Sequence, residues 1–132
     1  MNKFWGALVA VFLVPTSSFA KPTLSDAIEC RAEFSSIMTV VQAARIPMNI
    51  DVQETNFWVS ASDKFSRHFR GLSSEDLDGG GDVKSADVQD ELDATKEAKK
   101  KTYFRVLKDS GYDGLKEMAL KTTSECNTLF GL

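Results

Sequence analysis

The chain has little of the material from which most recognisable active sites are built. It contains one histidine, two cysteines and three prolines in 132 residues. The motifs HExxH, CxxC and CxxCH, a serine nucleophile elbow and a glycine-rich phosphate loop are all missing from the sequence. These absences remove the usual motif evidence for a metalloprotease, a dithiol oxidoreductase, a haem protein, a serine hydrolase or a nucleotide-binding enzyme. We therefore predict no catalytic residue and expect a protein that is not an enzyme.

A strong excess of one charge sign is also missing. The chain has 16 Lys and Arg against 19 Asp and Glu, which gives a formal net charge of −3. A surface that binds nucleic acid needs clustered cations to neutralise the phosphates, so this balance argues against a nucleic-acid partner. Hydrophobic residues make up 42% of the chain and charged residues 27%, as in ordinary folded domains, which argues against wholesale disorder.

The first twenty residues have the composition of a secretory signal. Lys3 is followed by an apolar segment over residues 4–14, and Ser18 and Ala20 are small residues at the positions that signal peptidase reads. We expect cleavage after Ala20, which leaves an exported protein, periplasmic or secreted. The alternative is a membrane anchor, but crossing a bilayer takes about 20 apolar residues. No stable membrane insertion is therefore expected after cleavage.

The only two cysteines are Cys30 and Cys126, which lie far apart in the sequence. In an oxidising compartment, two cysteines in a small domain usually pair. We predict a disulfide bond between them. Two separate buried thiols are the alternative. A redox-active pair is disfavoured because catalytic pairs normally lie close together in sequence.

Residues 21–132 follow helical periodicity almost throughout, and period-two alternation is nearly absent. Helices are predicted over 24–45, 52–70, 85–109 and 113–129, with Ser110 and Gly111 ending the third. Apolar positions at three- and four-residue steps define the expected inner faces. These faces are Ala27, Cys30, Phe34, Ile37, Val41 and Ala44 in the first helix; Phe57, Ala61, Phe65 and Phe69 in the second; Val88, Leu92, Thr95, Ala98, Thr102 and Val106 in the third; and Leu115, Ala119, Thr122, Cys126 and Leu129 in the fourth.

This pattern predicts an all-α fold, a small up-down-up-down four-helix bundle formed by a single domain over residues 21–132. The first and last helices of such a bundle are antiparallel neighbours. Cys30 near the start of the first helix and Cys126 near the end of the last would therefore meet at one end. A disulfide linking the first and last helices would stabilise the domain by roughly 4 to 5 kcal/mol. The glycine-rich segment 71–82 is predicted to form a mobile loop, since each glycine costs a helix about 1 kcal/mol.

The loop over residues 76–87 resembles the calcium-binding EF-hand loop in part. Acidic residues stand at loop positions one, three and twelve, a glycine stands at position six and an apolar residue at position eight. A helix is expected on each side of the loop. The candidate calcium ligands are the four aspartates of this loop, Asp76, Asp78, Asp82 and Asp87.

The same loop departs from the EF-hand pattern in three places. Gly80 at position five offers no side-chain oxygen, and Lys84 at position nine brings a cation. Position twelve is Asp87, whose side chain is shorter than the glutamate that normally binds through both oxygens. A second, paired hand is absent from the sequence. The alternative interpretation is a solvated acidic connection.

Two adjacent aromatic pairs, Phe57 with Trp58 and Tyr103 with Phe104, stand out in the middle of the chain. Consecutive helical residues point about 100° apart, so one ring of each pair should lie at a helix flank. We take Trp58, Tyr103 and Phe104 as the candidate partner surface, because flank rings could line a groove for an apolar ligand or a partner helix. The alternative is that these rings pack in the core or under the loop.

Two basic groups are interpreted as solvated surface. Lys96 and residues 99–101 form a basic run that follows an acidic turn in the third predicted helix. His68 is the only histidine, and with Lys64, Arg67 and Arg70 it forms a basic patch on the second predicted helix. An enzymatic role for His68 would require it to face a cleft that contains a carboxylate.

These observations favour a non-enzymatic binding or interaction protein whose partner is an unknown protein or a small apolar ligand. The alternative is a calcium-binding regulatory or structural protein that uses the EF-hand-like loop. No other cofactor is expected.

Overall fold

A computed structural model of the chain describes residues 20–132, so the expected signal segment before Ala20 lies outside the described residues. The described part contains three α-helices and no strand: α2 (Leu24–Ala44), α3 (Val52–Arg70) and α4 (Ala86–Leu129), with a short 3₁₀-helix, η2 (Ser74–Asp76), between α3 and α4. The all-α prediction is confirmed. Within residues 20–132, none of the helices combines the length and the apolar character that a membrane span requires.

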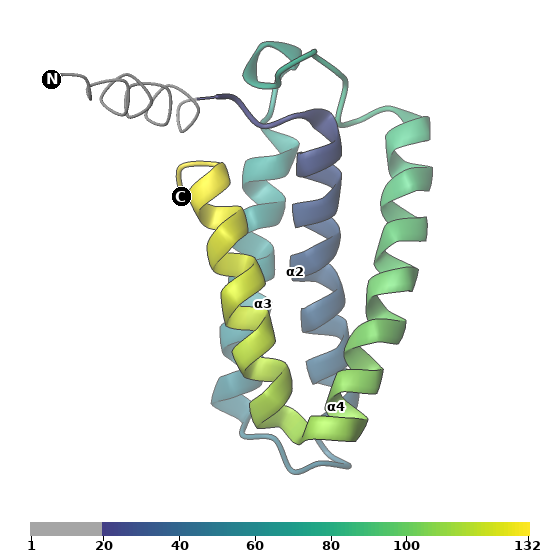
Figure 1. Cartoon of the computed structure of the whole chain (residues 1–132), viewed down its shortest axis with the longest axis vertical. Coiled ribbons are helices and arrows are strands. Elements are labelled where there is room, and N and C mark those ends of the chain that lie inside the picture. The colour runs from purple at the N-terminus through teal and green to yellow at the C-terminus, as the bar shows by residue number, and fades with distance from the viewer. Residues whose placement is uncertain (1–19) are drawn as a thin grey trace, which may run out of the picture.

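The predicted number of helices is corrected by the structure. The helices expected over 85–109 and 113–129 form one element, α4, of 44 residues. Gly111 inside α4 has φ 71° and ψ −176°, and the chain reverses its direction there (Figure 1). Glycine adopts a positive φ without steric cost, so the helix resumes directly after the bend without a loop. Four separate helices are therefore not confirmed. We call residues 86–110 the first arm of α4 and residues 112–129 its second arm.

The central element is α2, which packs against both α3 and α4. The chain runs along α2 in one direction, returns along α3, and then follows the two arms of α4 in opposite directions (Figure 1). The start of α2, the connection between α3 and α4, and the end of α4 consequently lie at the same end of the molecule, which we call the loop end.

The prediction for α2 is confirmed in detail. All six residues of its expected inner face are buried, and its N-terminus is closed by a capping box between Thr23 and Asp26. Asp51 caps α3 through a hydrogen bond from the backbone N–H of Gln53 to its side chain. The caps were readable from the sequence because each depends on residues two or three positions apart, and the apolar face of α2 was readable because it is wide.

The predicted inner face of α3 is right for Phe65 and Phe69 and wrong for Phe57. Trp58 is only 1% exposed, whereas Phe57 is 52% exposed. The buried face of α3 includes three small hydroxyl residues, which the apolar pattern could not reveal. Its members are Thr55, Trp58, Ser62, Phe65, Ser66 and Phe69.

The inner face of the first arm of α4 also differs from the prediction. Tyr103 is 3% exposed and packs with Leu107, whereas the predicted inner residues Ala98 and Thr102 are exposed. Phe104 is 43% exposed. Trp58 and Tyr103 are thus core residues and not a partner surface, and only Phe104 of the three candidates is exposed. One ring of each aromatic pair does lie outside the core, as predicted.

The predicted disulfide bond between Cys30 and Cys126 is confirmed. It joins α2 to the second arm of α4, and the two Cα atoms lie 5.6 Å apart across a sequence separation of 96 residues. Both cysteines are buried in the core cluster at the loop end, with Phe34 and Phe65. The bond therefore fixes the second arm of α4 against α2 near the C-terminal end of that arm.

The glycine-rich segment makes several specific contacts with the rest of the bundle. The backbone N–H of Asp78 donates to the carbonyl of Pro22 over 2.8 Å, and Leu77 and Val83 are buried. Gly81 has φ 134°, and a side chain there would collide with Leu24. These contacts do not test mobility, so the mobility of residues 71–82 stays a prediction.

Candidate binding groove

Two hollows lie between α3 and the C-terminal part of the second arm of α4. We call the space that they occupy the groove. The aromatic hollow has a volume of about 280 Å³, and the terminal hollow has a volume of about 450 Å³. The aromatic hollow is lined by Phe34, Phe57, Ser60, Ala61, Lys64, Phe65 and Asn127. The terminal hollow is lined by Pro22, Arg67, His68, Gly71, Leu72, Asp76, Leu129 and Phe130.

The aromatic hollow has two buried, stacked rings in its wall. Phe34 from α2 and Phe65 from α3 have ring centroids 4.9 Å apart and planes 15° apart. Phe57 stands at the hollow as a half-exposed ring, and it contacts Trp58 edge-on with centroids 4.9 Å apart. The buried Trp58 donates a hydrogen bond of 3.1 Å from its indole to the Tyr112 hydroxyl, which fixes its ring. Three aromatic rings thus line the hollow, and two of them are buried.

The polar lining of the aromatic hollow consists of Ser60, Lys64 and Asn127. A serine hydroxyl, a lysine ammonium and an asparagine amide can all donate hydrogen bonds. No acidic side chain lines this hollow, and Lys64 makes no ion pair with any residue in the described range 20–132. The hollow is therefore apolar with one unneutralised positive charge.

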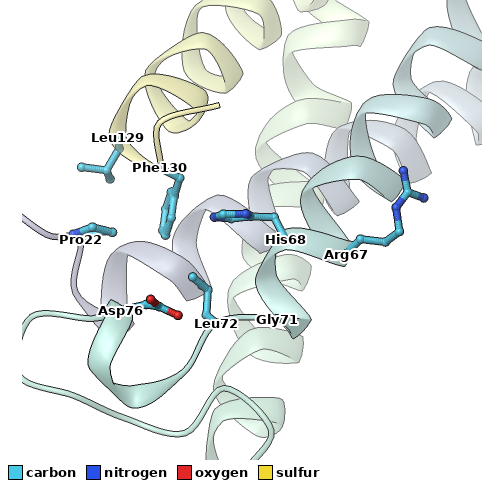
Figure 2. Close-up of a pocket in the computed structure, with 8 residues that line it drawn as sticks. All are labelled: Pro22, Arg67, His68, Gly71, Leu72, Asp76, Leu129 and Phe130. Atoms are coloured by element: carbon cyan, nitrogen blue, oxygen red, sulfur yellow. The ribbon is translucent and has the colours of Figure 1, made fainter.

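Figure 2 shows the terminal hollow at the loop end, with the His68 ring directed toward Phe130 and the Arg67 side chain directed away. Phe130 packs nearly perpendicular to both His68 and Phe65, with centroid distances of 5.8 and 5.3 Å. Because Phe65 also lines the aromatic hollow, these packed rings form the boundary between the two hollows.

His68 does share the terminal hollow with a carboxylate, that of Asp76. No hydrogen bond or ion pair connects His68 with Asp76 in the described structure. Instead, the Asp76 carboxylate accepts hydrogen bonds from the backbone N–H and the hydroxyl of Ser73, at 2.7 and 3.0 Å. These bonds lower the pKa of Asp76. The Asp76 carboxylate therefore caps its own turn at Ser73.

The other proposed calcium ligands are dispersed along the loop. Asp82 accepts a hydrogen bond from the backbone N–H of Lys84, and Asp87 lies in the first turn of α4. The helices predicted on both sides of the loop are present as α3 and α4, but α3 ends at Arg70, and the short η2 lies between it and the loop. Within residues 20–132, no three His, Cys, Asp or Glu side chains are grouped so that they could hold a metal ion. Calcium binding stays a prediction.

One lysine of the basic run, Lys99, differs from the prediction of solvated surface. Lys99 is not solvated surface, because its ammonium group lies 3.0 Å from Glu33 and 3.2 Å from Glu29 on α2. These three residues line a third hollow of about 240 Å³ beside the disulfide, together with Glu125. The position of Lys99 between Leu92 and Tyr103 on the inner face of α4 was the available signal.

A comparison with protein-family models, with curated proteins and with solved structures found no match to this chain. Its function has to be inferred from the chemistry of its own surfaces. Among these three hollows, the aromatic hollow combines an apolar lining, a half-exposed aromatic ring and few polar groups, which is the usual composition of a small-molecule site.

Proposed function

We propose that this chain is an exported, non-enzymatic binding protein that takes a small apolar ligand in the groove between α3 and the second arm of α4. The observation that carries the proposal is the half-exposed ring of Phe57, held by Trp58 beside the stacked Phe34 and Phe65. A ligand that covers this ring removes apolar surface from water, which contributes about 25 cal/mol for each Å².

The architecture supports this proposal. We infer that the two arms of α4 act as separate helices of an up-down-up-down bundle, because the chain reverses at Gly111. The ligand would then occupy the space between the second and fourth helices of that bundle. Facing helices in such bundles commonly hold ligands between them.

Export is supported by two further features. A disulfide bond is stable in an oxidising compartment, and residues 20–132 contain no helix suited to crossing a membrane. Both features are compatible with a protein that leaves the cytoplasm. We propose a periplasmic or secreted location and a function that depends on binding and not on catalysis.

The proposal is tested with a neutral apolar fluorophore, N-phenyl-1-naphthylamine, added to the protein recovered from the producing cell. We expect its fluorescence to rise on binding. The variant Phe57→Ala should weaken binding roughly tenfold, because about 1 to 2 kcal/mol of apolar contact is lost. Phe57 is half exposed, so circular dichroism should show an unchanged fold.

Phe104→Ala is the matched control, because Phe104 is also a partly exposed ring at a helix flank and lines none of the three hollows. It should leave binding unchanged. Equal effects of the two variants, or no binding at all, would contradict the proposed function.

A further inference from the structure

We infer that the ligand of the aromatic hollow is an amphipathic monocarboxylate, with an alkyl or aryl body against the rings and its anionic group at Lys64; this inference rests on the proposed function. The hollow combines an apolar aromatic surface with hydrogen-bond donors in its lining. A neutral hydrocarbon would use only the first feature, and an amine would be repelled by Lys64.

The charges around the hollow favour an anion. Lys64 is its only charged lining residue, and Ser60 and Asn127 add hydroxyl and amide donors. The carboxylates of this region are placed elsewhere. Asp76 lines the terminal hollow, and Glu125 lines the hollow beside the disulfide. An anion at Lys64 would therefore meet donors and no acidic lining residue.

The size of the hollow indicates a small molecule instead of a partner helix. A helix with its side chains is about 10 to 12 Å across. A hollow of about 280 Å³, with buried rings in its wall, admits one ring or one alkyl chain. A single anionic group is enough to occupy its one lysine.

The test compares three probes with the same ten-carbon chain and different head groups: decanoate, decan-1-ol and decylammonium. Each is titrated below its aggregation concentration into the wild-type protein by isothermal calorimetry. We expect decanoate to bind about fivefold more tightly than decan-1-ol, the effect of one exposed ion pair, and decylammonium to bind most weakly.

Lys64→Glu should reverse this order, so that decylammonium binds more tightly than decanoate. Lys121→Glu is the matched control, because it makes the same charge change at an exposed residue of the second arm that lines none of the three hollows. It should leave the order unchanged. Resonances of Phe57 and of the Asn127 side-chain amide should shift when decanoate binds to the wild-type protein.

Two results separate this inference from the proposed function. If decan-1-ol binds as tightly as decanoate, or if Lys64→Glu has no more effect than Lys121→Glu, the anionic ligand is refuted while the groove survives. If Phe57→Ala fails to weaken any probe, both the ligand class and the groove are refuted.

Discussion

The ammonium nitrogen of Lys99 on α4 lies 3.0 Å from a carboxylate oxygen of Glu33 on α2, inside the bundle. The Glu33 side chain is only 7% exposed, and its second oxygen accepts a hydrogen bond of 2.7 Å from Thr122 on the second arm of α4. Glu33 therefore contacts both arms of α4. Burial lowers the pKa of Lys99, but the charges of Glu33 and Glu29 and their hydrogen bonds outweigh it and raise that pKa.

Lys99→Met should destabilise the protein strongly, by about 3 kcal/mol, because it leaves the buried Glu33 charge without its partner. Chemical denaturation measures this loss of unfolding free energy. The double variant Lys99→Met with Glu33→Leu is the control, and it should recover much of the stability because the one carboxylate that it leaves unpaired, that of Glu29, is exposed. Additive losses in the double-mutant cycle would show that the two side chains are not coupled.

Tyr112 forms a second polar connection, between α3 and the start of the second arm of α4. Its hydroxyl donates to Glu54 over 2.6 Å and accepts from the Trp58 indole over 3.1 Å. Burial and the bond to Glu54 raise the pKa of Tyr112 to about 12. The fold therefore favours the neutral phenol. Its contribution to stability is complete below pH 10, the ordinary pKa, and is lost as the pH rises toward 12.

Tyr112→Phe should cost about 2 kcal/mol at neutral pH, because the buried Trp58 indole loses its acceptor. Thermal unfolding at several pH values measures this effect. Above pH 10 the wild type should lose more stability than the variant, so that their melting temperatures converge. Parallel pH profiles for the two proteins would show that Tyr112 is not the titrating group. Lys99 also titrates at alkaline pH, but it is present in both proteins.

Removing the disulfide by the double variant Cys30→Ser with Cys126→Ser should cost about 4 kcal/mol, because a closed loop of this length restricts the unfolded chain. The effect is read from the urea midpoint under oxidising conditions. Reduced wild-type protein should unfold at nearly the same urea concentration as the double variant. If reduction of the wild type leaves the midpoint unchanged, the cystine does not contribute to stability as we expect.

Millimolar calcium should leave the melting temperature unchanged, because Asp76 and Asp82 already accept hydrogen bonds from nearby backbone N–H groups. A ligand that binds only the folded state would raise the melting temperature. Differential scanning calorimetry with calcium, and with magnesium as the control, makes the measurement. A rise with calcium that Asp78→Ala abolishes would restore the EF-hand-like site.

The mature protein should begin at Lys21, because the apolar segment over residues 4–14 is too short for a membrane span and is followed by the small residues Ser18 and Ala20. Intact mass spectrometry of the protein from its own cell envelope measures the chain length. Protein expressed without access to the export machinery is the control and should retain Met1. A chain with Met1 in the membrane fraction of the native cells would identify an anchor instead.

The sequence by itself determined the helical class, the face and N-cap of α2, and the pairing of Cys30 with Cys126. These features depend on local periodicity, on capping side chains and on a count of two cysteines. Periodicity and caps depend on residues a few positions apart, and the cysteine pairing follows from there being only two, so none of these features requires knowledge of what packs against them.

Tertiary structure decided which side of α3 and α4 is buried. Ser62 and Ser66 of α3 are buried in the protein core, and Lys99 contacts Glu33 on α2. An apolar pattern assigns such residues to the surface. Their burial depends on how closely α3 packs against α2 and on a partner charge 66 residues away in the sequence. Phe57 became the exposed ring for the same reason. The binding groove therefore depends on helix packing, which no local pattern of residues specifies.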